Sequence, residues 1–139
     1  MKYMIMMFGS QRDYDMLTGR SADQPWTAEE IGALHAFMEE WNNDLVRSGE
    51  FVDAQGLTAP VHARRVQVHD GLPVVTDGPY PETQEVLAGY TIVETPSFDR
   101  ATEIAARLAG TPSPEGVSLG RDWYVDVRPV ADGRDDLDT

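Results

Sequence analysis

Apolar residues recur along the chain with two different periods, and these periods predict which segments are helices and which are strands. A stretch that opens with a capping box at Thr27 and Glu30 and ends at Gly49 has helical spacing. The stretch from Ser97, a residue suited to an N-cap, to Gly110 repeats that spacing. We therefore predict two helices. The apolar face of the first consists of Ile31, Leu34, His35, Met38, Trp41 and Leu45.

Shorter apolar segments predict strands. Residues 64–69 alternate in polarity and meet the tight-turn pair Asp70-Gly71 before an apolar run, which predicts a β-hairpin. Residues 2–8 are apolar without alternation, which favours a strand buried on both faces. The other predicted strands are residues 51–55, 90–93 and 123–130, and the predicted loops are residues 10–25 and 111–120.

The order of these elements is strand, helix, strand, hairpin, strand, helix, strand. It predicts an α+β fold in which two helices pack on one face of an antiparallel sheet. With 139 residues the chain suits a single domain over residues 1–131, followed by an acidic tail, residues 132–139, that we expect to be disordered.

Composition limits the chemistry and the partners. The chain has no cysteine, which excludes disulfides, thiolate catalysis and cysteine zinc sites, and which suits a cytoplasmic protein. The net charge of −13 argues against binding to nucleic acid or to an anionic membrane. The first apolar run is too short for a signal peptide or for a transmembrane helix.

Residues 76–85 combine turn residues with three carboxylates. Asp77 precedes Gly-Pro, so its carboxylate suits an Asx-turn; in a partly buried cleft it would instead be a general base or acid. Glu82 and Glu85 share one face if they lie on a helical turn. A solvated surface is the default for such a pair, although close carboxylates also raise one pKa and support acid–base work.

The remaining candidates each have a structural alternative. His35 is either a histidine at the edge of the core or a group that exchanges protons with a substrate. Arg128 either supports a dimer contact with Asp126 or holds a substrate carboxylate. The histidines lack metal-ligand spacing and no nucleotide-binding motif occurs, so we predict no metal and no cofactor. Four aromatic residues either line a pocket or belong to the core: Tyr3, Trp41, Tyr80 and Tyr90.

Residues 77–85, Asp-Gly-Pro-Tyr-Pro-Glu-Thr-Gln-Glu, resemble the signature of the DGPF-motif branch of the YCII-related family, with Tyr80 for Phe and Gln84 for Lys. Three other segments resemble that branch too: Gly89-Tyr90, residues 1–4 and residues 125–130. The resemblance implies a ferredoxin-like domain that pairs through its sheets into a dimeric α+β barrel. Relatives on that barrel include cofactor-independent enzymes of small aromatic or lactone-like molecules, among them a dehydrochlorinase.

These observations predict a homodimeric, cofactor-independent enzyme that couples proton transfer to elimination or isomerisation of a small organic molecule. In this hypothesis Asp77 is the base, and His35 or Glu82 is the acid. The predicted substrate contacts are Tyr80, Glu85, Tyr3 and Arg128. The alternative is a non-catalytic binding or regulatory module, such as a sigma-factor partner or a metabolite sensor, and a purely structural dimer ranks last.

Overall fold

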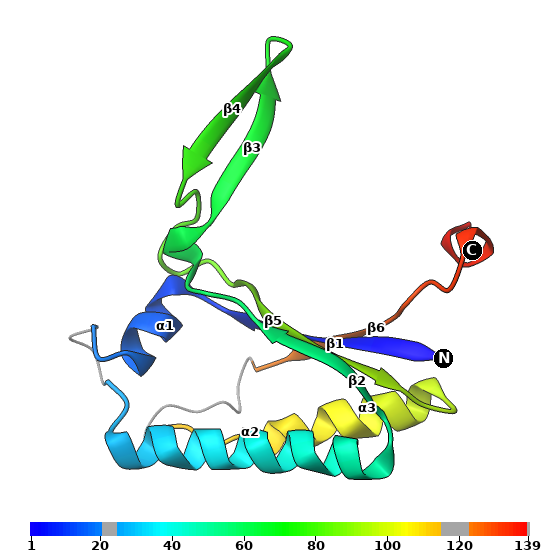
Figure 1. Cartoon of the computed structure of the whole chain (residues 1–139). Helices are drawn as coiled ribbons and strands as arrows, with labels where there is room; N and C mark the ends of the chain where they lie inside the picture. Colours follow the sequence, from blue (N-terminus) through cyan, green and yellow to red (C-terminus); the bar gives the residue numbers. More distant parts are fainter. Residues whose placement is uncertain (21–24, 115–122, 139) are drawn as a thin grey trace.

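An antiparallel sheet of four strands, with two helices along one of its faces, forms the body of the protein (Figure 1). The computed structural model describes residues 1–20, 25–114 and 123–138. The strand order is β2-β5-β1-β6, so the first strand of the chain lies inside the sheet between β5 and β6. The strands are β1 (Lys2–Gly9), β2 (Phe51–Gly56), β5 (Val86–Glu94) and β6 (Val125–Pro129). This is the predicted ferredoxin-like α+β fold.

The two long helices begin and end where their capping residues predict. In α2 (Ala28–Ser48), the Thr27 hydroxyl accepts a hydrogen bond from the Glu30 backbone N–H, and the Glu30 carboxylate accepts one from the Thr27 N–H. Gly49 ends the helix in the left-handed conformation, with φ of 79°. Ser97 caps α3 (Phe98–Ala106), which continues into the 3-10 helix η2 (Arg107–Gly110).

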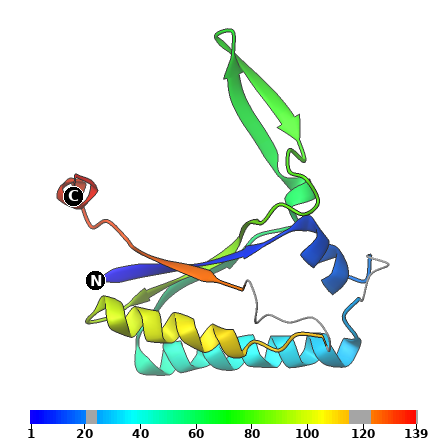
Figure 2. The ribbon, with the colours of Figure 1, turned by 180° about the vertical axis from the view of Figure 1, so that it is seen from behind.

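The core lies between these helices and the sheet, as both ribbon views show (Figures 1 and 2). The Trp41 indole N–H donates to the Ile104 backbone oxygen at 3.1 Å and so joins the two helices. The fully buried core side chains, with the sheet residues Ile5 and Val93 at its centre, are Ile5, Leu45, Ile104, Leu108 and Val93.

Neither α2 nor α3 lies on the opposite face of the sheet (Figures 1 and 2), and we call this face the uncovered face. It contains Met4 and Met6 of β1, which alternate with the buried Tyr3 and Ile5 and are themselves only partly buried. Within one chain this strand is therefore buried on one face only, and burial of its other face by a second subunit stays a prediction. Its continuous apolar run reflects one core face and one apolar face that is open. The neighbours of Met4 and Met6 on this face are Ile92, Arg128, Tyr90 and Asp126.

The predicted hairpin is confirmed, and it stands apart from the sheet. Strands β3 (Arg64–His69) and β4 (Leu72–Asp77) pair only with each other. Asp70 and Gly71 have φ values of 52° and 79°, the pair of positive angles that a type I′ turn requires. The hairpin projects on the uncovered side of the sheet, away from α2 and α3 (Figures 1 and 2).

Residues 10–25 are not simply a loop, because they begin with the helix α1 (Gln11–Leu17). Ser10 and Asp13 form a capping box, with the Asp13 carboxylate 2.8 Å from the Ser10 backbone nitrogen. This helix was missed because its sequence is mostly polar and too short to show a period. Residues 21–24 of the predicted first loop, and residues 115–122, which include residues 115–120 of the predicted second loop, lie outside the described residues.

Residues 131–138 are all exposed. In the predicted acidic tail, Arg134–Leu137 form a short helix, α4. No helix in the described ranges has the length and apolar character needed to cross a membrane.

Candidate functional site

The base of the hairpin is where the Asp-Gly-Pro-Tyr segment meets two other parts of the chain. The Gly78 backbone N–H donates to the Ala63 oxygen at 2.8 Å. Gly78 has φ of 53°, and a β-carbon at this position would lie 3.3 Å from the Val61 backbone oxygen. The Arg12 N–H donates to the Glu82 backbone oxygen at 3.1 Å. The segment therefore ties the connection between β2 and β3 to the start of α1.

Side chains of α1 complete this arrangement. Gln11 Oε1 accepts a hydrogen bond from the Val61 N–H at 2.8 Å. The Tyr14 hydroxyl donates to the Leu57 oxygen at 2.8 Å, and the Ala88 oxygen lies 3.4 Å away. Burial raises the pKa of Tyr14, so the phenol stays protonated and keeps this role as a donor throughout the physiological pH range.

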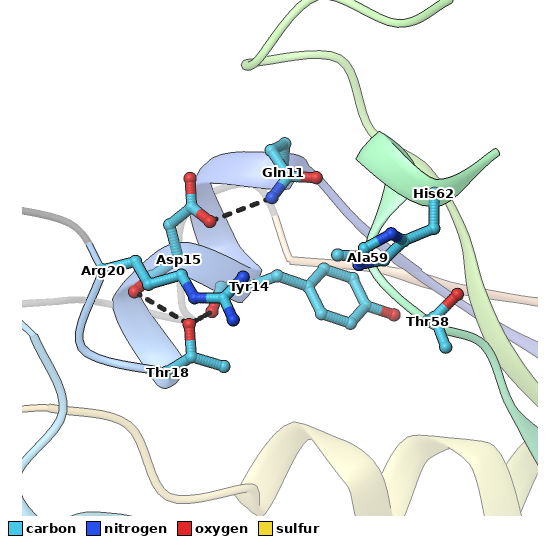
Figure 3. Close-up of a pocket in the computed structure, with 8 residues that line it drawn as sticks. All are labelled: Gln11, Tyr14, Asp15, Thr18, Arg20, Thr58, Ala59 and His62. Atoms are coloured by element: carbon cyan, nitrogen blue, oxygen red, sulfur yellow. Dashed lines mark hydrogen bonds between the residues drawn. The ribbon is translucent and has the colours of Figure 1, made fainter. Parts of the chain in front are cut away.

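Between α1 and the 3-10 helix η1 (Pro60–His62) lies a cavity of about 260 Å³, which we call the α1–η1 pocket (Figure 3). Figure 3 shows the Tyr14 ring extending from α1 toward Thr58 and His62 on the other wall. Its volume lies below the roughly 300–1,000 Å³ of drug-sized sites, so it suits a small metabolite. The lining residues are Gln11, Tyr14, Asp15, Thr18, Arg20, Thr58, Ala59 and His62.

Three lining side chains supply acid–base and ion-binding chemistry. His62 presents an imidazole, the side chain whose ordinary pKa lies closest to neutral pH. Arg20 presents a guanidinium, which suits a carboxylate or a phosphate. Gln11 Nε2 donates to Asp15 Oδ1 at 2.9 Å and fixes the carboxylate on the α1 wall. The pocket thus brings an imidazole, a guanidinium and a carboxylate to the lining of one small cavity.

Sequence analysis missed this pocket because it predicted a loop for residues 10–25 and gave His62, which is exposed, no role. The signal was nevertheless present in the Ser10–Asp13 capping box. A helix that begins there puts residues i, i+3, i+4 and i+7 on one face. Those residues are Gln11, Tyr14, Asp15 and Thr18, all four of which line the pocket.

The predicted catalytic residues do not come together. Asp77 ends β4 at the hairpin base, where its Oδ1 accepts a hydrogen bond from Arg64 Nε at 2.8 Å. Both side chains of this ion pair are about three-quarters exposed, at 74% for Arg64 and 78% for Asp77. His35 is exposed on α2, across the sheet from the hairpin (Figure 1), so it is not on the apolar face as predicted. A proton transfer shared by Asp77 and His35 is therefore excluded within one chain.

The two glutamates of the segment also take separate roles. Residues 78–85 form turns rather than a helix, so Glu82 and Glu85 do not share a helical face. Both are exposed. Interaction with the Glu85 carboxylate instead raises the pKa of Tyr124, whose ring stacks on that of Phe8 with 5.2 Å between the ring centroids.

The predicted substrate contacts are dispersed as well. Tyr80 is half-buried, and the guanidinium carbon of Arg65 lies 5.1 Å from the centroid of the Tyr80 ring. Tyr3 is only 4% exposed and packs against Phe98 in the core, so it is a core residue rather than a pocket residue. Arg128 lies exposed on the uncovered face beside Met4.

A second cavity, of about 220 Å³, lies between α2 and η2. Its charged groups satisfy each other, because Asp44 accepts hydrogen bonds from both Arg107 and Arg47. These bonds lower the pKa of Asp44, with that from Arg107 acting most strongly. Across residues 1–20, 25–114 and 123–138, no three acidic or histidine side chains gather into a group that would hold a metal ion.

Comparison with known proteins shows which family the chain resembles. The model of the YCII-related domain matches residues 1–115, which include every lining residue of the α1–η1 pocket. The chain belongs to the YCII-related family. This YCII-related chain is also similar to an uncharacterized protein of Rhizobium meliloti (strain 1021), with 25% identity over 111 residues. That match covers 80% of this chain and 84% of the relative.

Proposed function

We propose that this YCII-related protein is a cofactor-independent enzyme that moves a proton on a small organic acid, in an elimination or an isomerisation. The observation that carries the proposal is the α1–η1 pocket, in which His62, Arg20 and Asp15 line one small cavity. Its walls are joined by two hydrogen bonds, in which the Tyr14 hydroxyl donates to the Leu57 oxygen and Gln11 Oε1 accepts from the Val61 N–H. Fixed walls favour catalysis because they hold the substrate in place beside the reacting groups.

Each residue has a definite role in this proposal. Arg20 binds the carboxylate of the substrate through paired N–H donors, which fixes its orientation. His62 in its neutral form takes the proton from the carbon next to an acidifying group, and returns it or leaves it on a departing group. The Thr58 hydroxyl is an additional donor at the wall. Asp77 is assigned to the hairpin base, since its carboxylate is held by Arg64.

Two finer statements accompany this proposal. We place the chain in the DGPF-motif branch, because residues 77–85 match that motif except at Tyr80 and Gln84. We also propose that two copies pair through the uncovered faces of their sheets, because Met4, Met6 and Ile92 leave an apolar surface there. Light scattering at micromolar concentration should then give twice the 15.4 kDa mass of one chain.

A turnover screen with small hydroxy, keto and unsaturated carboxylic acids tests the catalytic proposal. The variant His62→Gln should keep the melting temperature and lose the activity by at least 100-fold, the size of effect expected for a general base. The matched control is His69→Gln, because His69 lies at the far end of the hairpin and is 79% exposed. Equal activity in both variants would remove His62 from the mechanism. Ligand binding without any turnover would favour the metabolite sensor instead.

A further inference from the structure

The hairpin has one apolar face that nothing in the described chain covers. We call residues 64–77 the arm. In the register of β3 and β4, Val66 lies opposite Val75 and Val68 lies opposite Pro73, so these four residues share one face. The three valines are 67%, 60% and 77% exposed, for Val66, Val75 and Val68 respectively. Every residue of both strands is exposed.

Such an arm is not stabilised by its own contacts. A two-stranded hairpin on its own is marginally stable in water, and it gains stability when a hydrophobic face packs against further structure. Contiguous exposed apolar surface on a soluble protein is a common sign of a binding interface. The arm is well paired along its length, with six pairs of residues in register from Arg64–Asp77 to His69–Leu72. It is therefore a formed element with an apolar face suited to binding a partner.

The position of the arm indicates what that partner is. The arm leaves the body on the same side as the uncovered face of the sheet (Figures 1 and 2). A second copy that faces this sheet would lie on the side to which the arm projects. The second copy also presents an uncovered face of matching character, with the partly buried apolar residues Met4, Met6 and Ile92. A twofold arrangement lets each copy give an arm and receive one.

The distribution of charge also favours a second copy of this chain as the partner of the arm. The chain carries a net charge of −13, so two copies repel each other over most of their surfaces. The arm contains two arginines, Arg64 and Arg65, and two aspartates, Asp70 and Asp77, so its formal charge is zero. It is thus a part of this acidic chain that a second copy can approach without net repulsion.

We propose that the arm of each copy packs its valine face against the uncovered sheet face of a second copy. The inference rests on the proposed dimer and adds to it the contact that the arm makes. It is independent of the α1–η1 pocket, whose test is ligand binding and turnover.

Disulfide trapping tests the contact directly, because the natural chain has no cysteine. The Val68→Cys variant carries one affinity tag and is co-expressed with a Met4→Cys or Arg128→Cys variant that carries a different tag. The purified protein is then oxidised mildly. We expect a cross-linked heterodimer with at least one of the two uncovered-face sites. No such product should form with His35→Cys, which is exposed on the helix side of the sheet. Cross-linking of Val68→Cys only with itself, or equally with His35→Cys, would overturn the proposal.

A pair of charge variants separates the arm contact from the dimer itself. Val68→Lys puts a charge on the apolar face, whereas Gln67→Lys puts the same charge on the other face of the same strand. We expect Val68→Lys to raise the dissociation constant of the dimer at least tenfold, and Gln67→Lys to leave it unchanged. A dimer that both variants leave intact would refute the arm contact while keeping the dimer. A natural chain that stays at 15.4 kDa would refute both.

Discussion

Replacing Gly78 by alanine should weaken the hairpin base for two separate reasons. Gly78 has φ of 53°, and an L-residue in this left-handed region costs about 1–2 kcal/mol. The new β-carbon would also lie 3.3 Å from the Val61 backbone oxygen, so the backbone there has to move. That movement strains the hydrogen bonds Gly78 N–H to Ala63 and Val61 N–H to Gln11, each 2.8 Å long. Losing the equivalent of one of them adds roughly 1 kcal/mol.

The expected total is therefore about 2–3 kcal/mol in the free energy of unfolding, or a fall in Tm on the order of 8 °C for a chain of this size. Gly71→Ala is the control, because Gly71 has φ of 79° and a β-carbon added there would meet no atom within 4 Å. Thermal denaturation followed by circular dichroism measures both. Equal losses in the two variants would show that the contact with Val61 contributes nothing, which would refute the close packing of the Asp-Gly-Pro-Tyr turn.

Three further changes probe the sheet, the ion pair between Glu50 and Arg100 of α3, and the pocket wall. Gly89→Ala should lower the free energy of unfolding by about 1–3 kcal/mol in a urea titration, because the new β-carbon would lie 2.9 Å from a backbone oxygen of β2. An unchanged midpoint of the titration would contradict this close packing. Glu50→Gln should lower the free energy of unfolding by about 1.5–3 kcal/mol at pH 7, because the Glu50 carboxylate accepts two hydrogen bonds of 2.8 Å from Arg100. The control is Glu103→Gln, which removes the exposed partner of the same arginine and should lower that free energy by under about 0.5 kcal/mol. The bond from Arg100 lowers the pKa of Glu50, so its contribution is complete above the ordinary glutamate value of about 4.3 and should disappear from melting curves as the pH falls below it. Tyr14→Phe should cost about 1 kcal/mol in the same melting assay through its lost 2.8 Å hydrogen bond, and no loss would mean that this bond does not fix the pocket wall.

Local chemistry predicted much of the fold, because certain short patterns have few structural solutions. The capping box at Thr27 and the left-handed Gly49 delimit α2, and Asp70-Gly71 permits a type I′ hairpin. The short α1 was missed, although Ser10 and Asp13 carry the same kind of box, because no apolar period follows them. Whether the hairpin joins the sheet or leaves it depends on tertiary packing, which alternation alone does not encode.

The site was harder to predict than the fold, because its groups come from segments that only the topology joins. Arg20 and His62 are 42 positions apart, and the pocket exists because Tyr14 and Gln11 bond to the connection that contains His62. Asp77 drew attention through its motif, but its nearest partner is a strand neighbour, Arg64. The motif thus indicates how the base of the hairpin is built, and the proposed site lies on the α1 side of that base.

The most direct test of the account is calorimetric titration of the natural chain and of Arg20→Gln with the small carboxylic acid that binds best in the screen. Arg20 contributes its backbone N–H to the Asp15 oxygen at 2.8 Å, and the substitution keeps that bond while it removes the guanidinium. We predict binding to the natural chain that is at least tenfold weaker in the variant, as expected for the loss of a charge-assisted bond worth about 1.5–3 kcal/mol. Equal affinity in the two proteins, or no binding of any acid to the natural chain, would contradict the assignment of the α1–η1 pocket as the functional site.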